Sequence, residues 1–228
     1  MLRIFNTNPL RQRRQAWRER CGKAPGFEFV AYVLEHGLAV MRPEHRPEVF
    51  DLRNHGSCRD PARWAMANAI IEDEARQGFI AEAPKALLPR CRWVHPLGLI
   101  PKGEDKVRII HDFSSPAGAS VNDRIDYVRL SYDKVDATFG AMRQGCFLAK
   151  TDISAFFRYI PLDPADWELM AFRWGGRLFV DTRLNFGQRN APEVAFRVSM
   201  VVLWHVKAAV EGMRLRGWDT SRSCATTV

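Results

Sequence analysis

The chain has 228 residues, of which 46% are hydrophobic and 26% charged, and it carries a formal net charge of +8 with a pI near 9.6. These proportions are ordinary for a globular protein of one or two compact units and exclude a chain too polar to fold. The longest apolar run, 198–210, is broken by His205 and Lys207, so no run reaches the ~20 residues that span a bilayer and we expect no membrane segment. The excess of positive charge favours a polyanionic partner.

Five cysteines are odd in number, widely separated and never in a CxxC pair. This pattern indicates neither a disulfide scaffold nor a zinc site. We therefore expect a reducing, intracellular compartment, cytoplasmic or nuclear, and a protein that is neither secreted nor held in a membrane.

The first 23 residues carry seven Arg or Lys against a single acid, Glu19. A solvated flexible arm, a phosphate-binding segment and a nuclear-targeting segment are all consistent with this charge run. A mitochondrial transit peptide is less well supported, because the segment is not rich in serine. We treat residues 1–50 as a basic N-terminal arm or extension.

The first strong helical signal begins at Asp60, which suits the N-cap position, with Pro61 at the first helical position and Gly78 beyond the end. Residues at helical spacing form its apolar stripe: Trp64, Ala67, Ile71 and Ala75. Next, two β-rich runs within "WVHPLGLIPKGEDKVRIIHDFS" flank a charged tip at 102–105. This composition predicts a β-hairpin.

Further along, Ser131 or Asp133 can cap a helix that ends at Gly145, and "CFLAKTD" then reads as a strand that stops at Asp152. A second hairpin is predicted around Gly175-Gly176, a pair that tolerates the positive φ of a tight turn. A long helix is predicted from Asn190, with the stripe Val194, Val198, Val201 or Val202, His205 and Ala209. Antiparallel hairpins mixed with helices predict an α+β fold rather than a doubly wound parallel sheet.

One residue of the stretch "LAKTDISAFFRYIPL" raises a chemical question. An ionised carboxylate at the end of an apolar strand, Asp152, is costly unless a cation compensates it, and a divalent metal is the strongest compensator. The structural alternative is that Asp152 caps the following turn through its side chain.

Three blocks, "KVRIIHDFSSPAGASVNDRI", "TDISAFFRYIPLDPADW" and "LNFGQRNAP", occur in this order and together resemble the reverse transcriptase family. Within the family, the likeness is greatest to DIRS-type tyrosine-recombinase retrotransposons. The resemblance implies a right-hand polymerase fold with antiparallel strands packed on helices. It also implies a fingers-like subdomain at 51–127, a partial palm at 128–212 and an atypical tail at 213–228.

The resemblance implies roles for single residues. Asp152 matches the first metal-binding aspartate of the palm, where two Mg²⁺ ions, assisted by the carbonyl of Ile153, would clamp the primer 3′-hydroxyl and the nucleotide phosphates. Phe157 matches the aromatic residue under the sugar of the incoming nucleotide, which favours deoxynucleotides. From the residues alone, Phe157 reads as a core phenylalanine, and Phe156 is best left as one.

Three cations match the fingers residues that hold the triphosphate: Lys102, Lys106 and Arg108. Taken alone, they also fit a solvated hairpin of alternating charge. Asp112 falls at a recurrent acidic position that we interpret as structural. We treat "SSPAGASVNDRI" as a marker of the family without assigning it chemistry.

In "NFGQRNAP", the resemblance implies that Gly187 lets the backbone approach nucleotide and template, and that Asn190 and Pro192 start the helix beneath the primer-template. Arg189 would contact template phosphate. Two residues depart from the family pattern, Asn185 at a usual proline and Gln188 at a usual apolar position. We expect both to be tolerable surface-level changes.

The family also needs an aromatic-x-Asp-Asp hairpin, which this chain lacks: after Asp181 its one aspartate is Asp219, without an acidic neighbour. A single carboxylate is too small a ligand set for two Mg²⁺. We therefore expect a chain truncated before that motif: a polymerase fragment that binds RNA or DNA template, primer and deoxynucleoside triphosphates but is inactive alone. A non-catalytic nucleic-acid-binding remnant and an unrelated basic α+β domain stay open as alternatives.

Overall fold

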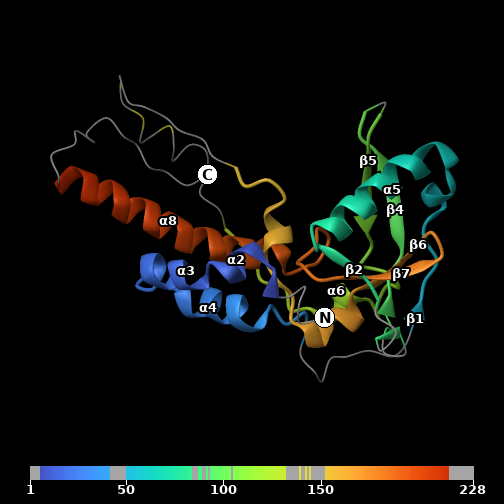
Figure 1. The fold of residues 1–228 in the computed structure, drawn as a ribbon, viewed down its shortest axis with the longest axis horizontal. Coiled ribbons are helices and arrows are strands. Elements are labelled where there is room, and N and C mark those ends of the chain that lie inside the picture. Colours follow the sequence, from blue (N-terminus) through green and yellow to red (C-terminus); the bar gives the residue numbers. More distant parts are fainter. Residues whose placement is uncertain are drawn as a thin grey trace.

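The computed structural model describes residues 6–41, 50–83, 87–88, 91, 93–103, 105–131, 139, 142, 144 and 152–215. Within this part of the chain, a mixed sheet and a separate β-hairpin lie at one end, and the N-terminal helices and the long C-terminal helix lie at the other (Figure 1). The helix predicted to begin at Ser131 or Asp133 and the strand predicted before Asp152 lie outside the described residues.

The larger sheet has five strands in the order β1-β3-β6-β7-β2. The strands are β1 (Phe50–Asp51), β2 (Ile80–Glu82), β3 (Trp93–Val94), β6 (Ala171–Trp174) and β7 (Arg177–Asp181). Pairing of β3 with β1 and with β6 is parallel, whereas β7 pairs antiparallel with both β6 and β2. The predicted α+β class is confirmed.

Both predicted hairpins are present. Strands β4 (Leu97–Pro101) and β5 (Val107–His111) pair antiparallel, with Leu97 opposite His111 and Pro101 opposite Val107. The β6–β7 hairpin turns at Gly175 and Gly176, whose φ angles are +56° and +76°. Two consecutive positive φ angles are what the favoured two-residue hairpin turn requires, and glycine adopts them without steric penalty.

Helix α5 (Pro61–Arg76) follows the sequence prediction closely. The Asp60 side chain accepts a 3.0 Å hydrogen bond from the backbone N–H of Ala62, as an N-cap should. Ala67 and Ile71 are buried, but Ala75, predicted on the same stripe, is exposed. Glu74 instead turns inward because a buried arginine binds it, as described below.

Helix α8 (Ala191–Leu215) is the long C-terminal helix that the sequence predicts. Val194, Val198 and Val201 are buried, whereas Ala209 is exposed in the part of the helix that extends away from the sheet (Figure 1). None of the helices that the structure describes is long and apolar enough to cross a membrane.

The basic N-terminal segment is helical. Its helices are α2 (Pro9–Gln12), α3 (Arg14–Cys21) and α4 (Phe27–His36), and α3 and α4 pack against α8 (Figure 1). A β-bridge between Leu38 and Leu162 ties the segment to the rest of the molecule, and the buried Asn8 donates a 2.9 Å hydrogen bond to the carbonyl of Tyr159. The arginines of α3 therefore lie on a docked helix.

Two hydrophobic clusters fill the two faces of the sheet. Ala171 and Val180 belong to the cluster shared with α3, α4 and α8, while their neighbours Phe172 and Phe179 belong to the cluster under α5 and the β4–β5 hairpin. This follows from the alternation of side chains along a strand. Short helical turns connect the elements: η2 (Gly56–Arg59), α6 (Val121–Arg124), η4 (Phe156–Tyr159) and η5 (Pro164–Leu169).

Candidate functional site

A cavity of about 660 Å³ opens where segments distant in sequence meet. Its lining includes residues of all three motif blocks: Ser114 and Asn122 of the first, Phe157 of the second, and Gly187, Gln188, Arg189, Ala191 and Pro192 of the third. Tyr127, just after the first block, also lines it. Four residues with predicted binding roles are thus brought together: Phe157, Gly187, Arg189 and Pro192. The blocks are separated in the sequence, so it is the fold that brings these residues together.

Phe157, which lines the cavity, forms an aromatic pair with Phe186. The ring of Phe157, half-buried against the core, lies 4.6 Å from the ring of Phe186, centroid to centroid, and the rings are tilted by 52°. Phe186 is 59% exposed, which is unusual for phenylalanine. Phe186 was not predicted from the sequence; its position directly before Gly187 was the available signal. The backbone is strained nearby, because Ala155 has a φ of +51°.

Gly187 is required by the backbone itself. Its φ is +99°, and a Cβ at this position would lie 2.9 Å from the carbonyl oxygen of His111 and 3.6 Å from the ring of Phe113. Any side chain would therefore be both strained and crowded. The loop can pack against the end of β5 only because residue 187 is glycine.

The two departures from the family pattern are buried, which corrects the expectation that they lie at the surface. Asn185 and Gln188 are each 2% exposed. Asn185 Nδ2 donates a 2.9 Å hydrogen bond to Asp181, and Gln188 Oε1 accepts one of 2.8 Å from the backbone N–H of Asn185. Both polar residues are paired, so they shape the loop from within.

The residues that begin α8 have the predicted arrangement. The carbonyl of Asn190 accepts a 3.0 Å hydrogen bond from the N–H of Val194, which opens the helix, and Pro192 lies in its first turn. Arg189 and Pro192 are exposed beside the cavity. The Asn190 Oδ1 atom is buried without a hydrogen-bond partner among the described residues.

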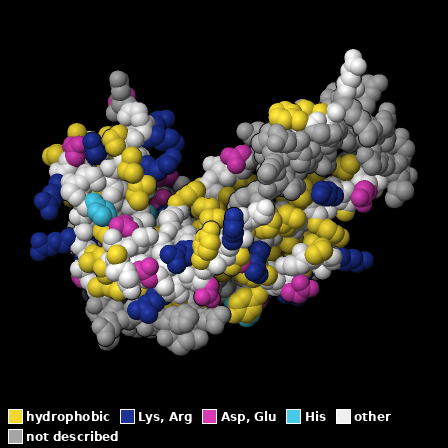
Figure 2. Space-filling model, turned by 180° about the vertical axis from the view of Figure 1, so that it is seen from behind, with side chains coloured by type: hydrophobic (Ala, Val, Ile, Leu, Met, Phe, Trp, Pro, Cys, Tyr) yellow, Lys and Arg dark blue, Asp and Glu magenta, His cyan; other side chains and the backbone are white. Residues whose placement is uncertain are grey.

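The three predicted phosphate-binding cations lie on the β4–β5 hairpin. Arg108 lies opposite Ile100, and the ladder continues through a 2.8 Å hydrogen bond from the Lys102 N–H to the Lys106 carbonyl. Because side chains alternate along strands, Lys102, Lys106 and Arg108 share one face of the hairpin. All three are exposed, and Figure 2 shows Lys and Arg side chains gathered on this part of the molecule. They do not line the cavity.

Asp152 and Ile153 are exposed at the start of the described segment 152–215. Asp152 makes no hydrogen bond or ion pair with another described residue, and neither residue lines the cavity. Together they supply one carboxylate and one carbonyl, whereas Mg²⁺ takes near-octahedral oxygen coordination. These donors are a partial set, and the metal role of Asp152 stays a prediction.

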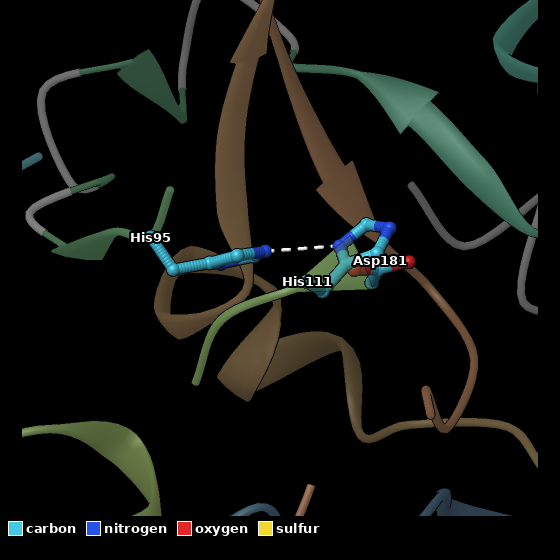
Figure 3. Close-up of side chains that lie close together, drawn as sticks. All are labelled: His95, His111 and Asp181. Carbon is cyan, nitrogen blue, oxygen red and sulfur yellow. Dashed lines mark hydrogen bonds and ion pairs between the residues drawn. The ribbon is translucent and has the colours of Figure 1, made fainter. Parts of the chain in front are cut away.

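A buried network of charged and polar groups contacts the 185–189 loop through Asp181 and His111. His95 Nε2 lies 3.0 Å from His111 Nδ1, and His111 Nδ1 lies 3.3 Å from Asp181 Oδ2 (Figure 3). Asp181 Oδ1 accepts a 2.5 Å hydrogen bond from Arg158, which also binds Glu74 at 2.8 Å. No periodicity in the sequence signalled this network, because its members come from five separate segments.

Burial sets the charge states in this network. Burial, with the neighbouring His111, lowers the pKa of His95 to about 3, so this ring is neutral at physiological pH. Burial alone would raise the pKa of Asp181, but the charges of Arg158 and His111 outweigh it and hold that pKa well below its usual range. Asp181 is therefore an anion held by a buried cation.

The same group could by composition hold a metal ion. The ligand atoms of His95, His111 and Asp181 lie within 4.8 Å of one another. Asp181 Oδ2, however, already accepts from Asn185, and its other oxygen is bound by Arg158. A second cation beside that guanidinium would be repelled, so the geometry fits a structural network better than a metal centre.

No family model matches the sequence, and no curated protein matches it. The fold is reverse-transcriptase-like. In particular, the chain is similar to a crystal structure of prototype foamy virus protease-reverse transcriptase, with a TM-score of 0.52, 19% identity, and coverage of 86% of this chain and 27% of that one. It is also similar to the foamy viral protease-reverse transcriptase solved in complex with an RNA/DNA hybrid, with a TM-score of 0.53, 17% identity and the same coverages, 86% and 27%.

Proposed function

We propose that the chain is the fingers and part of the palm of an RNA-directed DNA polymerase from a DIRS-like retroelement. One observation carries the proposal: Phe157, from the second motif block, lines the same cavity as Gly187 and Arg189, from the third. In the complete enzyme, a primer 3′-hydroxyl would attack the α-phosphorus of a deoxynucleoside triphosphate, and pyrophosphate would leave.

The cavity is suited to receive the end of a primer-template with its incoming nucleotide. The Phe157 and Phe186 rings offer an apolar surface to a sugar or base, since every base has a π-face that an aromatic ring can stack on. The exposed guanidinium of Arg189 can bind template phosphate bidentately. The Lys102, Lys106 and Arg108 face of the hairpin would hold the triphosphate.

Asp152 and the Ile153 carbonyl are proposed as part of a Mg²⁺ site. A bound divalent ion would lower the barrier to phosphoryl transfer by neutralising developing charge. Mn²⁺ is a spectroscopic probe of such a site: wild-type protein should broaden the Mn²⁺ electron paramagnetic resonance signal beyond the level given by primer-template and nucleotide alone. Asp152→Asn should return the signal to that protein-free level. An unchanged Mn²⁺ signal on Asp152→Asn would remove Asp152 from the site.

A second candidate is a non-catalytic nucleic-acid-binding remnant of such an element. It is supported by the exposed cationic face of Lys102, Lys106 and Arg108 and by the partial oxygen donor set that Asp152 and Ile153 supply. The remnant keeps the basic surface but does not turn over.

Primer extension separates the two candidates, and duplex binding tests what they share. Fluorescence anisotropy with an RNA template annealed to a DNA primer should show binding that weakens with added salt, because bound phosphates release counterions. Extension with Mg²⁺ and all four nucleotides should be undetectable for the remnant and measurable for an active polymerase fragment. Failure to bind the duplex at low salt would contradict both candidates.

A further inference from the structure

We propose that Asn122 is a positioning residue that holds the 185–189 loop in the shape that receives the paired template base and nucleotide. This inference rests on the proposed function. Asn122 belongs to the "SSPAGASVNDRI" segment, for which the sequence predicted no chemistry.

The Asn122 side chain bridges three backbone or side-chain groups of two distant segments. Its Nδ2 donates to the carbonyl of Gly187 at 2.8 Å and to Ser114 Oγ at 2.9 Å. Its Oδ1 accepts from the backbone N–H of Arg189 at 2.8 Å. The amide thus uses both of its N–H donors and its oxygen, a combination that no carboxylate or hydroxyl side chain can reproduce.

Asn122 lines the cavity but is only 7% exposed, and its polar atoms are all engaged within the protein. It therefore has little left to offer a ligand directly. What it controls is the backbone on either side of Gln188: the carbonyl before it and the N–H after it. Asn122 acts through the loop, so it is a positioning residue and not a catalytic one.

The 185–189 loop contains a flexible position that the two hydrogen bonds from Asn122, here called the clamp, can restrain. Gly187 has a φ of +99° and is exposed, and glycine crosses between backbone regions more freely than any other residue. Without the two bonds from Asn122, the Gly187 carbonyl and the Arg189 N–H are free to turn. The exposed Arg189 guanidinium and the Phe186 ring would then lose their fixed directions.

Asn122 is itself held firmly. Its backbone N–H donates a 2.9 Å hydrogen bond to the carbonyl of Phe113, at the end of the strand segment against which Gly187 packs. Helix α6 around it starts with a capping box, in which Asp123 Oδ2 accepts from the backbone N–H of Ser120 at 3.0 Å and from its hydroxyl at 2.7 Å. A rigid anchor on one side can therefore fix a glycine loop on the other.

The test compares wild type, Asn122→Ala and Asn122→Asp. Hydrogen exchange of the Arg189 amide should accelerate roughly tenfold or more in Asn122→Ala, because removing a hydrogen bond of ordinary strength changes an equilibrium by about that factor. Asn122→Asp keeps the acceptor for that amide but places a carboxylate oxygen against the Gly187 carbonyl. Both variants should also weaken binding of the RNA-DNA primer-template by roughly tenfold. If the alanine variant fails to fold, Asn122→Asp, equal in size, tests the Gly187 side of the bridge through its lower duplex affinity.

A matched control is available at Asn54. Its Oδ1 accepts from the Leu97 N–H at 2.9 Å and its Nδ2 donates to the Arg173 carbonyl at 2.8 Å, the same kind of bridge outside the cavity. Asn54→Ala should lower the melting temperature like Asn122→Ala while leaving duplex affinity within about twofold, the range of an uninvolved residue.

The outcomes separate the two proposals. Unchanged exchange at Arg189 in Asn122→Ala would overturn the clamp, and so would faster exchange with duplex affinity equal to that of wild type. In both cases the proposed function stands if wild type binds the duplex. If wild type does not bind, the proposed function fails and the role assigned to Asn122 fails with it.

Discussion

The Arg158 guanidinium donates a 2.5 Å hydrogen bond to Asp181, and both side chains are buried, at 5% and 0% exposure. Arg158 directly follows Phe157, and Asp181 ends the strand that leads into the 185–189 loop. The pair therefore joins two walls of the cavity. A second bond of 2.8 Å from Arg158 to Glu74 extends the tie to helix α5.

Removing Arg158 should destabilise the protein strongly. Arg158→Met leaves the Asp181 carboxylate buried without its cation, which costs about 3–5 kcal/mol of unfolding free energy. Urea denaturation followed by circular dichroism measures the change. Arg173→Met is the control, because Arg173 pairs with Asp51 at the surface, where both are about half exposed and such pairs contribute under about 1 kcal/mol. Equal losses for the two variants would contradict the assigned role of Arg158.

His95 should make the fold sensitive to acid. Its pKa is about 3 in the folded protein and near the ordinary value of 6.5 when unfolded, so below about pH 6.5 the unfolded chain binds a proton that the folded one does not. Stability is therefore complete above that pH and falls as pH drops toward 3, by up to about 1.4 kcal/mol per pH unit.

A comparison of His95→Phe with wild type isolates this contribution. Phenylalanine can keep the packing against the Phe113 ring, whose centroid is 4.3 Å away, and has no nitrogen to protonate. Unfolding free energies measured between about pH 6.5 and pH 4.5, above the range in which Asp181 protonates, should show a shallower slope for the variant. Parallel slopes for the two proteins would show that His95 is not buried as a neutral ring.

Gly187→Ala should damage both stability and duplex binding. A left-handed φ costs an alanine about 1–2 kcal/mol, and crowding of its Cβ against the His111 carbonyl adds to that. Gly118→Ala is the matched control, since Gly118 also has a positive φ, +81°, but nothing within 4 Å of its Cβ position. Thermal unfolding and anisotropy should show the smaller loss of stability and unaltered binding for Gly118→Ala. A Gly187→Ala protein equal to that control would mean that the loop shifts freely.

Neutralising the hairpin cations should weaken duplex or nucleotide binding without affecting the fold. Lys102→Ala and Arg108→Ala replace exposed side chains, so unfolding free energy should change by at most about 0.5 kcal/mol. If a cation binds a phosphate of the duplex, its removal should reduce the slope of the logarithm of the duplex binding constant against the logarithm of salt concentration by roughly 0.7–0.9. Arg63→Ala, whose side chain pairs with Asp60 on α5, should leave that slope unchanged. Identical slopes for all variants would remove the hairpin from the binding surface.

Local patterns in the sequence determined much of the architecture. Asp60 with Pro61 marks the start of α5, the Gly175-Gly176 pair marks the β6–β7 turn, and Asn190 marks the start of α8. These features depend on interactions within a few residues, which is why they can be read without a structure.

Other features were decided only by packing between distant segments. Glu74 turns inward because Arg158, 84 residues away, binds it, and Gln188 and Asn185 are buried because Asp181 and the loop backbone pair with them. Strand β3, two residues long, was hidden in a run that reads as part of the first hairpin. Hydrogen bonds and burial of this kind depend on which surfaces meet, and no local periodicity encodes that.

The candidate site likewise combines residues that the sequence identified with contacts that only the structure revealed. The motif blocks, through their resemblance to reverse transcriptases, named Phe157, Gly187 and Arg189, and each of these residue types has a chemical meaning that can be read locally. Their convergence on one cavity, the exposure of Phe186 and the clamp from Asn122 came from the tertiary structure. The physical reason is that a chain pattern specifies what each residue can do, whereas only the folded core specifies which residues are near enough to do it together.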